Sequence, residues 1–530
     1  MCSNFSFGQD FTNKGKDFWV GYGSHVRMYH TTSNDPDKYD LNKQNMVLYF
    51  TSDRDANVVV EIPGLSNWRR LYSVKANKVT ASEIMPKGTS GIDARLMTEG
   101  KSTKGIHITS DVPIIAYAHI YNGNQSGATL LFPTPTLGRD YYSLNYKQVS
   151  NENDSYSYAF VIATEDNTDV EIIPSAKTKG DPGYPSRLKG DTIKVKLNKG
   201  EIYNILGEQT SISYNGMGQI VKTTGNDLTG TRIRSVGTCR RIAVFSGTGK
   251  MSISCSNNAS SSDNFIQQVM PLSVWGKKYL TVPTSGMEFN FYRILAPQNS
   301  NNVKVNGVLQ NGKIDGMYYE VSGNTPLLIE SDEPILVAQY ISSQNSCGNP
   351  SPYNLGDPEM IYLSPVEQTI NKITINSTPF AAIKIHFINI IIENSSINSL
   401  RIDGNIPIET PKQHPGDPDR VYLQVRLNEG SHTIEADKGF NAIAYGYGEY
   451  ESYGYNAGTL VKDLSQYIVL KNAKAEVNYP ITCTNSPFKI SIVLPYITPK
   501  IRWTSKDLFL DSTTLNPSYV SIFLPNGITA

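Results

Sequence analysis

The sequence lacks long apolar runs, an excess of charge of either sign, and all but a few cysteines. It contains 48 Lys and Arg residues against 48 Asp and Glu residues, so its formal net charge at pH 7 is zero. Nucleic acids and anionic membranes attract basic surfaces, so neither is a predicted partner. The longest apolar stretch, 383–392, is interrupted by Lys384, His386 and Asn389, so no membrane-spanning segment is predicted.

Cysteine is scarce, with five residues among 530. None belongs to a C-x-x-C pair, so neither a zinc site nor a thiol redox motif is predicted. Cys239 and Cys255 flank the apolar segment 242–245 and a glycine turn, which makes them our candidate disulfide. Cys255 and Cys347 form the alternative pair, and buried free thiols are the third possibility. A bridge requires Cα atoms within about 7 Å.

Helical periodicity is also hard to find. Short alternating runs rich in Val, Ile, Tyr and Thr recur instead, bounded by Gly, Pro, Asn and Asp, as in 46–50, 58–62 and 114–121. Such runs are typical of β-strands joined by turns. The sequence therefore predicts an all-β fold with less than about 10% helix, well below the average of globular proteins.

The order of these signals repeats along the chain. Gly15, Gly138 and Gly276 each precede an aromatic strand opening, at 18–19, 141–142 and 279–280. We expect these openings to be equivalent strands.

A second recurring signal comes later in each unit. A Ser-Asp-x-Pro turn precedes an apolar strand at 110–113 and again at 331–334, whereas the second unit has 235–239 there and matches imperfectly. A fourth, more divergent unit begins near Pro365.

The repeats predict a multi-domain organisation. Units of this size fit tandem β-sandwich-like repeats better than propeller blades or solenoid coils. The predicted units are 1–135, 136–270, 271–364 and a divergent 365–465. Residues 466–530 follow as an Ig-like or PKD-like sandwich that is short for such a domain. Trp19, Trp275 and Trp503 are expected to be largely buried, because each lies in or beside an alternating apolar strand.

Three segments carry a family resemblance. They are GKDFWVGY at 15–22, DNFIQQVMPLSVWG at 263–276, and GDPEMIYLSP at 356–365. These residues resemble the IgGFc-binding protein N-terminal domain family, and the third segment is similar to bacterial members attached to surface-exported proteins. The tail from Ala473 is similar to the PKD or Ig-like modules that follow such domains. The resemblance covers most of residues 10–460 and implies a secreted or surface adhesive module, with no catalytic motif to carry over.

Two groups of residues were weighed for chemistry. His25, His30, Asp35, Asp37 and Asp40 are close in sequence, but the two histidines point to opposite faces of a strand, and the aspartate spacing misses the calcium-loop pattern. We interpret this stretch as a solvated loop and predict no metal and no cofactor.

The second group comprises the turns 123–127 and 246–249. Neither matches G-x-S-x-G or precedes a helix, so both are interpreted as hairpin turns and no catalytic residue is predicted.

The segment 445–456 is the candidate ligand surface. Five tyrosines alternate there with glycines and two glutamates, namely Tyr445, Tyr447, Tyr450, Tyr453 and Tyr455. Tyrosine offers a large contact area with few torsions to freeze, which suits a binding surface. A tyrosine-rich hairpin whose rings pack across strands is the alternative.

The whole pattern predicts a secreted or cell-surface binding or adhesion protein that is not an enzyme. Its expected partner is a host or extracellular glycoprotein or glycan, recognised through polar loops at one end of the sandwiches. Two alternatives remain open: a structural spacer of a surface protein, and a carbohydrate-active enzyme whose paired carboxylates only the fold would bring together.

Overall fold

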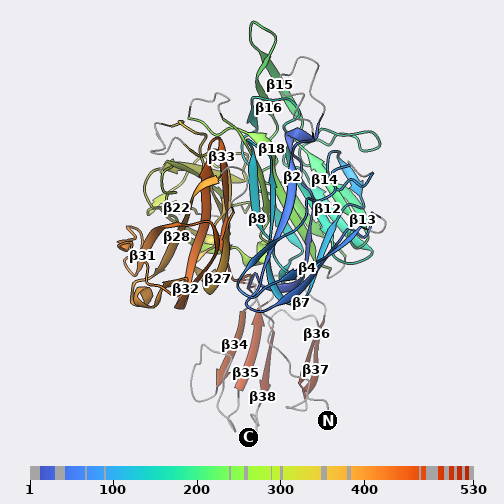
Figure 1. Cartoon of the computed structure of the whole chain (residues 1–530). Coiled ribbons are helices and arrows are strands. Elements are labelled where there is room, and N and C mark those ends of the chain that lie inside the picture. The colour runs from blue at the N-terminus through green and yellow to red at the C-terminus, as the bar shows by residue number, and fades with distance from the viewer. Residues whose placement is uncertain are drawn as a thin grey trace. The chain divides into compact units, whose positions relative to one another are not determined.

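The computed structural model shows an all-β chain that divides into two compact units, Met1–Val461 and Lys462–Ala530 (Figure 1). The residues it describes are 12–29, 42–65, 68–88, 91–237, 240–255, 261–287, 289–298, 302–347, 355–378, 383–462, 464, 467–472, 488–493, 500–505, 510–515 and 520–524. All helices within these ranges are short 3₁₀ helices, so the predicted fold class is confirmed. No helix in the described part is long and apolar enough to cross a membrane.

Equivalent strands recur four times in the first unit. The opening strands are β1 (Gly15–Val20), β9 (Asp140–Tyr142), β20 (Gly276–Leu280) and β27 (Ile370–Ser377). The second strands are β2 (Asn45–Thr51), β11 (Ser157–Ala163), β21 (Asn290–Leu295) and β28 (Ile383–Glu393). The third strands are β3 (Ala56–Glu61), β12 (Thr168–Ile173), β22 (Lys304–Val305) and β29 (Arg401–Ile402).

The remaining strands complete each repeat. The outer strands are β4 (Arg69–Val74), β13 (Ile193–Leu197) and β23 (Val308–Leu309) on one side, and β5 (Val79–Ala81), β14 (Ile202–Leu206), β24 (Tyr318–Gly323) and β31 (Arg420–Leu427) on the other. The long strands are β7 (Ile106–Tyr121), β25 (Leu328–Ile341) and β32 (Gly430–Gly448), replaced in the second repeat by β17 (Arg232–Ser235) and β18 (Ile242–Met251). The last strands are β8 (Ser126–Leu130), β19 (Asp263–Gln268), β26 (Glu359–Tyr362) and β33 (Glu451–Gly458).

Each repeat is organised by its long strand. In the first repeat, the first half of β7 pairs with β1 and β3, and its second half pairs with β2 and β8. The same division holds for β25 and for β32. In the second repeat the long strand is divided: β17 pairs with β9 and β12, and β18 pairs with β11 and β19. The division falls at 235–239, where the Ser-Asp-x-Pro signal matches imperfectly. All these ladders are antiparallel, and each long strand passes from one sheet to the other.

Side-chain contacts confirm the equivalence of the first and third repeats. The Asp111 carboxylate accepts hydrogen bonds from the backbone and side chain of Asn57, and Lys16 donates to the Asp111 carbonyl oxygen. Asp332 has the same bonds to Asn302 and Lys277. The aspartate is that of the Ser-Asp-x-Pro signal, so the motif holds the kink of the long strand.

The opening glycine of each repeat contacts a proline that starts the next repeat. A Cβ atom on Gly15 would lie 2.2 Å from Pro133 Cβ, and one on Gly276 would lie 2.2 Å from Pro365 Cβ. Each proline begins a 3₁₀ turn: η3 (Thr134–Thr136), η4 (Leu272–Val274) or η5 (Val366–Gln368). Only glycine fits these junctions, because any side chain would collide with the proline ring.

Four further elements extend the repeats. β6 (Gly100–Ser102) pairs with β14 of the second repeat, and β30 (Lys412–Gln413) pairs with β31. The 3₁₀ turns η1 (Val26–Met28) and η6 (Asn394–Ser399) lie in the first and fourth repeats. A three-stranded sheet of β10 (Val149–Ser150), β16 (Ile220–Gly225) and β15 (Gln209–Tyr214) is added to the second repeat.

The last strands of the four repeats meet at the centre of the first unit. β8 contacts β19 and β33, and β26 contacts the same two strands, so the four strands close a ring of contacts. The strands of the repeats fall within the four predicted ranges, but these ranges pack into one compact unit and share this centre.

Gln267 links all four last strands. From β19, its side-chain nitrogen lies 2.9 Å from Ala128 O, 2.7 Å from Met360 O and 3.2 Å from Gly454 O, and its two N–H groups are shared among them. Gln267 is buried, so each carbonyl would otherwise lack a partner in a medium without water.

Two of the three tryptophan predictions are confirmed and one is wrong. Trp19 and Trp275 are buried, and Trp275 donates its indole N–H to the carbonyl oxygen of Met270. Trp503, in the second unit, is only half-buried, and its indole lies along the neighbouring strand, where it donates to Thr514 Oγ1.

The second unit contains two small antiparallel sheets among its described residues. One comprises β34 (Tyr467–Asn472), β35 (Phe488–Val493) and β38 (Val520–Leu524), and the other comprises β36 (Lys500–Ser505) and β37 (Leu510–Leu515). An Ig-like or PKD-like fold for this unit stays a prediction.

We expect Gln267→Ala to destabilise the first unit by about 3 kcal/mol, because it removes shared bonds and leaves buried carbonyl groups unpaired. Urea unfolding followed by tryptophan fluorescence measures the change. Gln298→Ala is the matched control, since Gln298 is exposed and should change stability by less than about 0.5 kcal/mol. Equal stabilities of the two variants would contradict a central role for Gln267.

Candidate functional site

Four turns gather at one end of the first unit, which we call the loop end. They belong to the connections between the long and the last strand of each repeat, and their described residues are 122–125, 252–255, 261–262, 342–347, 355–358 and 449–450. They lie together because the strands that follow them pack side by side. The Ser126 backbone N–H donates to the Asp263 carboxylate, as does that of Ser452, and the Asp357 N–H donates to Ser452 Oγ.

A disulfide joins two of these turns. Cys255 and Cys347 are bonded, with their Cα atoms 5.2 Å apart, and so connect the second and third repeats. The candidate pair Cys239–Cys255 is therefore wrong, and the alternative pair is the one formed. Cys255 lies beyond β18 in the turn, so it faces the equivalent turn of the next repeat. Cys239 lies outside the described residues.

A hairpin of β15 and β16 projects from the loop end, at the top of Figure 1. Its tip is held by Asn215, whose side-chain oxygen accepts the backbone N–H groups of Met217 and Gln219. Met217 is 81% exposed and Tyr214 is 59% exposed. The tip is thus a rigid loop that presents apolar side chains to solvent. Sequence reasoning missed it, although Asn215-Gly216 is a hairpin-turn signal.

A pocket of about 300 Å³ opens beside this hairpin, between the second and third repeats. It is lined by two aromatic rings, three hydroxyl or sulfur side chains, one aliphatic residue and two charged residues: Tyr146, Phe291, Ser252, Ser254, Cys255, Val149, Lys147 and Glu320. The disulfide therefore forms part of its wall. No single segment of sequence signals this pocket, because its lining comes from four segments spread between Tyr146 and Glu320.

Arg293 fixes the floor of the pocket. Its guanidinium lies 4.2 Å from the ring centroid of Tyr146, and its Nε donates to Glu320 at 2.9 Å. Another of its nitrogens contacts Asp227 at 2.5 Å, which joins the second and third repeats. Because the buried guanidinium is paired and stacked, the positions of Tyr146 and Glu320 are preset before any ligand arrives.

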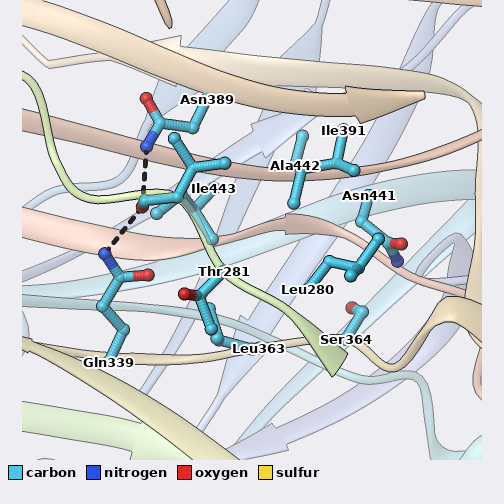
Figure 2. A pocket seen from close by; sticks show the side chains of 11 residues that line it. Leu280, Thr281, Gln339, Leu363, Ser364, Asn389, Ile391, Asn441, Ala442 and Ile443 are labelled. Carbon is cyan, nitrogen blue, oxygen red and sulfur yellow. Dashed lines mark hydrogen bonds between the residues drawn. The ribbon is translucent and has the colours of Figure 1, made fainter. Parts of the chain in front are cut away.

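A second cavity lies between the third and fourth repeats (Figure 2), but it encloses only about 20 Å³. Gln339 and Asn389 both donate side-chain hydrogen bonds to the Val282 carbonyl oxygen beside it. The space is sufficient for one water molecule and too small for an organic ligand. Its polar groups therefore serve the contact between the repeats.

The predicted tyrosine surface is corrected by the structure. Tyr445, Tyr447, Tyr453 and Tyr455 are all at most 3% exposed, and Tyr450 alone is exposed, at the turn. Glycine opposite a ring explains the alternation, since a Cβ on Gly446 would lie 2.5 Å from the Tyr453 ring. The alternative interpretation, in which the rings pack across strands, therefore holds for four of the five tyrosines. These four rings are not accessible to a ligand.

Hydrogen bonds hold these rings inside the fold. Tyr445 donates to Asn389 Oδ1 at 2.7 Å, and Tyr455 donates to the Asn376 carbonyl oxygen at 2.8 Å. The Tyr453 hydroxyl lies 3.0 Å from His386 Nδ1. Burial raises the pKa of each of these tyrosines, so they stay neutral.

The other residues weighed for chemistry lie in structural positions. His25 is buried, its Nδ1 accepts the Arg27 backbone N–H, and burial lowers its pKa well below the usual value. His30, Asp35, Asp37 and Asp40 lie outside the described residues. The interpretation of 246–249 as a hairpin turn is wrong, because these residues lie inside β18. Ser246 is buried there, with its hydroxyl 2.8 Å from that of Tyr362.

Comparisons with known proteins match the middle of the chain. The sequence model of the family described as IgGFc binding protein matches residues 127–446, from the last strand of the first repeat to the long strand of the fourth. The human protein named IgGFc-binding protein is 24% identical over 351 residues. That match covers 64% of this chain and 6% of the human protein, so the chain spans a small part of this relative.

We expect a non-reduced digest to contain a linked peptide pair with Cys255 and Cys347. The variant Cys255→Ser/Cys347→Ser should lose about 2–5 kcal/mol of stability, because the bridge closes a loop of 92 residues. Mass spectrometry and urea unfolding measure the two outcomes. A pair containing Cys239 and Cys255 would contradict the assignment.

Proposed function

From the premise that this chain belongs to the IgGFc binding protein family, we propose that it is an extracellular binding protein that recognises a glycoprotein through its loop end. The observation that carries the proposal is the pocket between the second and third repeats. Ligand sites are concave, placed at domain junctions, and combine apolar walls with a few polar groups. This pocket has all three properties.

The pocket's chemistry favours one sugar residue of a glycan as the occupant. Tyr146 and Phe291 supply aromatic faces on which the C–H face of a sugar ring packs. Ser252, Ser254 and Glu320 supply hydrogen-bonding groups for sugar hydroxyls. The volume of about 300 Å³ holds one monosaccharide, with the rest of the glycan outside.

The projecting hairpin supports contact with the protein part of the partner. Met217 at its tip and Tyr214 beside it are exposed without a neighbour that covers them. Methionine and tyrosine are favoured at protein interfaces, because the first adapts its shape and the second offers a large rigid ring. The partner would then be held at two places, its glycan in the pocket and its polypeptide on the hairpin.

The disulfide supports an extracellular or cell-surface location. Structural disulfides persist in oxidising compartments and are rare in the cytosol. Cys255 is exposed, so a reducing environment would have access to this bridge.

Binding is preferred over carbohydrate cleavage as the activity. Among the residues that line the pocket, Glu320 is the single carboxylate, and it is paired with Arg293, whereas a glycosidase uses two carboxyl groups. The four carboxyl groups of Asp263, Asp357, Glu359 and Glu451 are buried. The carboxylates of a glycosidase flank the scissile bond and must reach it, so this cluster has no access to a sugar.

The pocket is tested by Ser254→Phe, which fills it from its rim. We expect the intact chain to bind members of a panel of immobilised glycans and secreted glycoproteins, and the variant to lose at least about tenfold in affinity. Ser213→Phe, on the exposed face of the hairpin, is the matched control and should bind glycans normally. Unchanged glycan binding by Ser254→Phe would contradict the pocket, and no binding by the intact chain would favour the structural spacer.

The hairpin is tested by Tyr214→Ser/Met217→Ser. We expect weaker binding to the intact glycoprotein, by about 1–3 kcal/mol, and unchanged binding to the free glycan. Surface plasmon resonance with both analytes measures this difference. Ile408→Ser, at a 95% exposed position in the fourth repeat, is the control for loss of exposed apolar surface. The proposal fails if both variants weaken glycoprotein binding equally.

A further inference from the structure

Four carboxyl groups from three repeats gather where the last strands begin. Asp263 starts β19, Asp357 and Glu359 precede and start β26, and Glu451 starts β33. All four are at most 1% exposed. They lie directly below the loop end, at the junction that holds the repeats together.

The four groups divide into two pairs by their hydrogen bonds. The Asp263 carboxylate accepts the backbone N–H groups of Asn264 and Ser126, and the Glu359 carboxylate accepts those of Met360 and Gly454. Backbone N–H donors stabilise the ionised form of a carboxyl group. These bonds offset part of the cost of ionising Asp263 and Glu359 in a buried position.

Asp357 and Glu451 are less well supplied with donors. The Gln344 backbone N–H and the Ser261 hydroxyl lie near Asp357 without forming a hydrogen bond of ordinary geometry, and Glu451 has no nearby donor of this kind among the described residues. None of their four carboxyl oxygens has a hydrogen-bond partner among the described residues, although all four are buried. A buried, unpaired carboxylate is costly, so the protonated form is the stable one. A proton on one carboxyl would also supply a donor to a neighbouring carboxylate.

The surrounding charges do not neutralise the cluster. The charged or titratable groups on the neighbouring elements include His25 and Arg27 at η1, His119 on β7, Glu152 after β10, Tyr158 on β11, Lys250 on β18, Tyr362 on β26, Tyr447 on β32 and Tyr453 on β33. Lys250 and Arg27 both bond to Glu152, so two cations share one carboxylate. The remaining positive charge favours the ionised form of Asp357 but cannot neutralise four carboxyl groups. Burial lowers the pKa of His119 to about 3, so it is uncharged.

Burial is the main cause that raises the pKa of each member. It raises the pKa of Asp357 to about 7, although the Ser261 hydroxyl and the nearby Lys250 ammonium favour the ionised form. The pKa values of Asp263, Glu359 and Glu451 are raised well above their usual range by burial, and for Asp263 and Glu451 also by repulsion from neighbouring carboxylates.

We propose that these four carboxyl groups form a pH-dependent lock beneath the loop end. When Asp357 and Glu451 hold protons, the last strands stay packed and the turns above them are held in place. When the protons leave, unpaired negative charges face one another at the starts of β26 and β33. Their repulsion loosens the adjoining turns 355–358 and 449–450.

The sign of the pH effect follows from the raised pKa values. An unfolded Asp or Glu ionises near pH 4, whereas these folded groups keep their protons to higher pH. Their contribution to stability is fully present below about pH 4 and is lost as the pH rises through the folded values, about 7 for Asp357. The first unit should therefore be more resistant to unfolding at pH 5 than at pH 8.

The test is Asp357→Asn/Glu451→Gln in the full chain, because an amide resembles a protonated carboxyl group and cannot ionise. We expect the variant and the parent to melt at similar temperatures at pH 5, and the variant to melt about 3 °C or more higher at pH 8. Asp93→Asn is the control with the opposite sign. Its carboxylate is bonded to Arg95, which holds the Asp93 pKa low despite partial burial, so this variant should lose stability at pH 8.

A second measurement needs no variant. Amide hydrogen exchange of residues 355–360 and 449–454, corrected for the intrinsic effect of pH, should speed up at least about fivefold between pH 5 and pH 8. The equivalent segment of the first repeat, 122–128, has no carboxyl group and should not change in this way.

Three results would overturn the lock. One is a parent that melts no lower than the double variant at pH 8. Another is unchanged exchange in both carboxyl-bearing segments. The third is a rise in the parent's melting temperature with millimolar Ca²⁺ at pH 8 that EDTA reverses and the double variant lacks, because the carboxylates would then hold a cation instead of protons. None of these readouts involves a glycan ligand, so they are independent of the proposed function.

Discussion

The close packing of the four last strands is the constraint on which the rest of the structure depends. The strands approach so tightly that a Cβ atom on Gly127 would lie 2.6 Å from the Asn264 carbonyl oxygen. At this distance the buried backbone needs partners that water cannot supply, and the Gln267 amide provides them for three strands at once. The four repeats therefore do not form separate domains along the chain, because their last strands pack together in one shared core.

This centre places the functional surface. Because the last strands meet, the turns that precede them also meet, and side chains from different repeats reach one another there. The pocket, the disulfide and the carboxyl cluster each contain residues from at least two repeats. The paired Arg293 below the pocket and the rigid turn at Asn215 in the hairpin keep this surface ordered without a ligand.

The tyrosine segment 445–456 shows that a local sequence pattern can predict secondary structure without predicting which side chains are exposed. Alternating tyrosine and glycine predicts a β-hairpin correctly, and β32 and β33 form one. Alternation does not show whether each face of the hairpin is exposed to solvent or buried. The hairpin lies at the centre of the first unit, so both of its faces are covered and four of its tyrosine rings belong to the core. The opening glycines mark strand starts as predicted, but the Ser-Asp-x-Pro signals were interpreted wrongly as turns between strands. They lie inside continuous long strands, at 110–113 in β7 and at 331–334 in β25, where the chain passes from one sheet to the other.

The sequence by itself determined the all-β class and the family resemblance, and its recurring signals predicted repeated units. These follow from side-chain alternation and turn residues, which act over a few neighbouring positions. Tertiary structure decided which cysteine bonds to Cys255, which tyrosines are exposed, and where the pocket and the buried carboxyl groups lie. Those features arise from contacts between residues about 90 to 190 positions apart, as between Asp263 and Ser452, and no local pattern records which repeat packs on which.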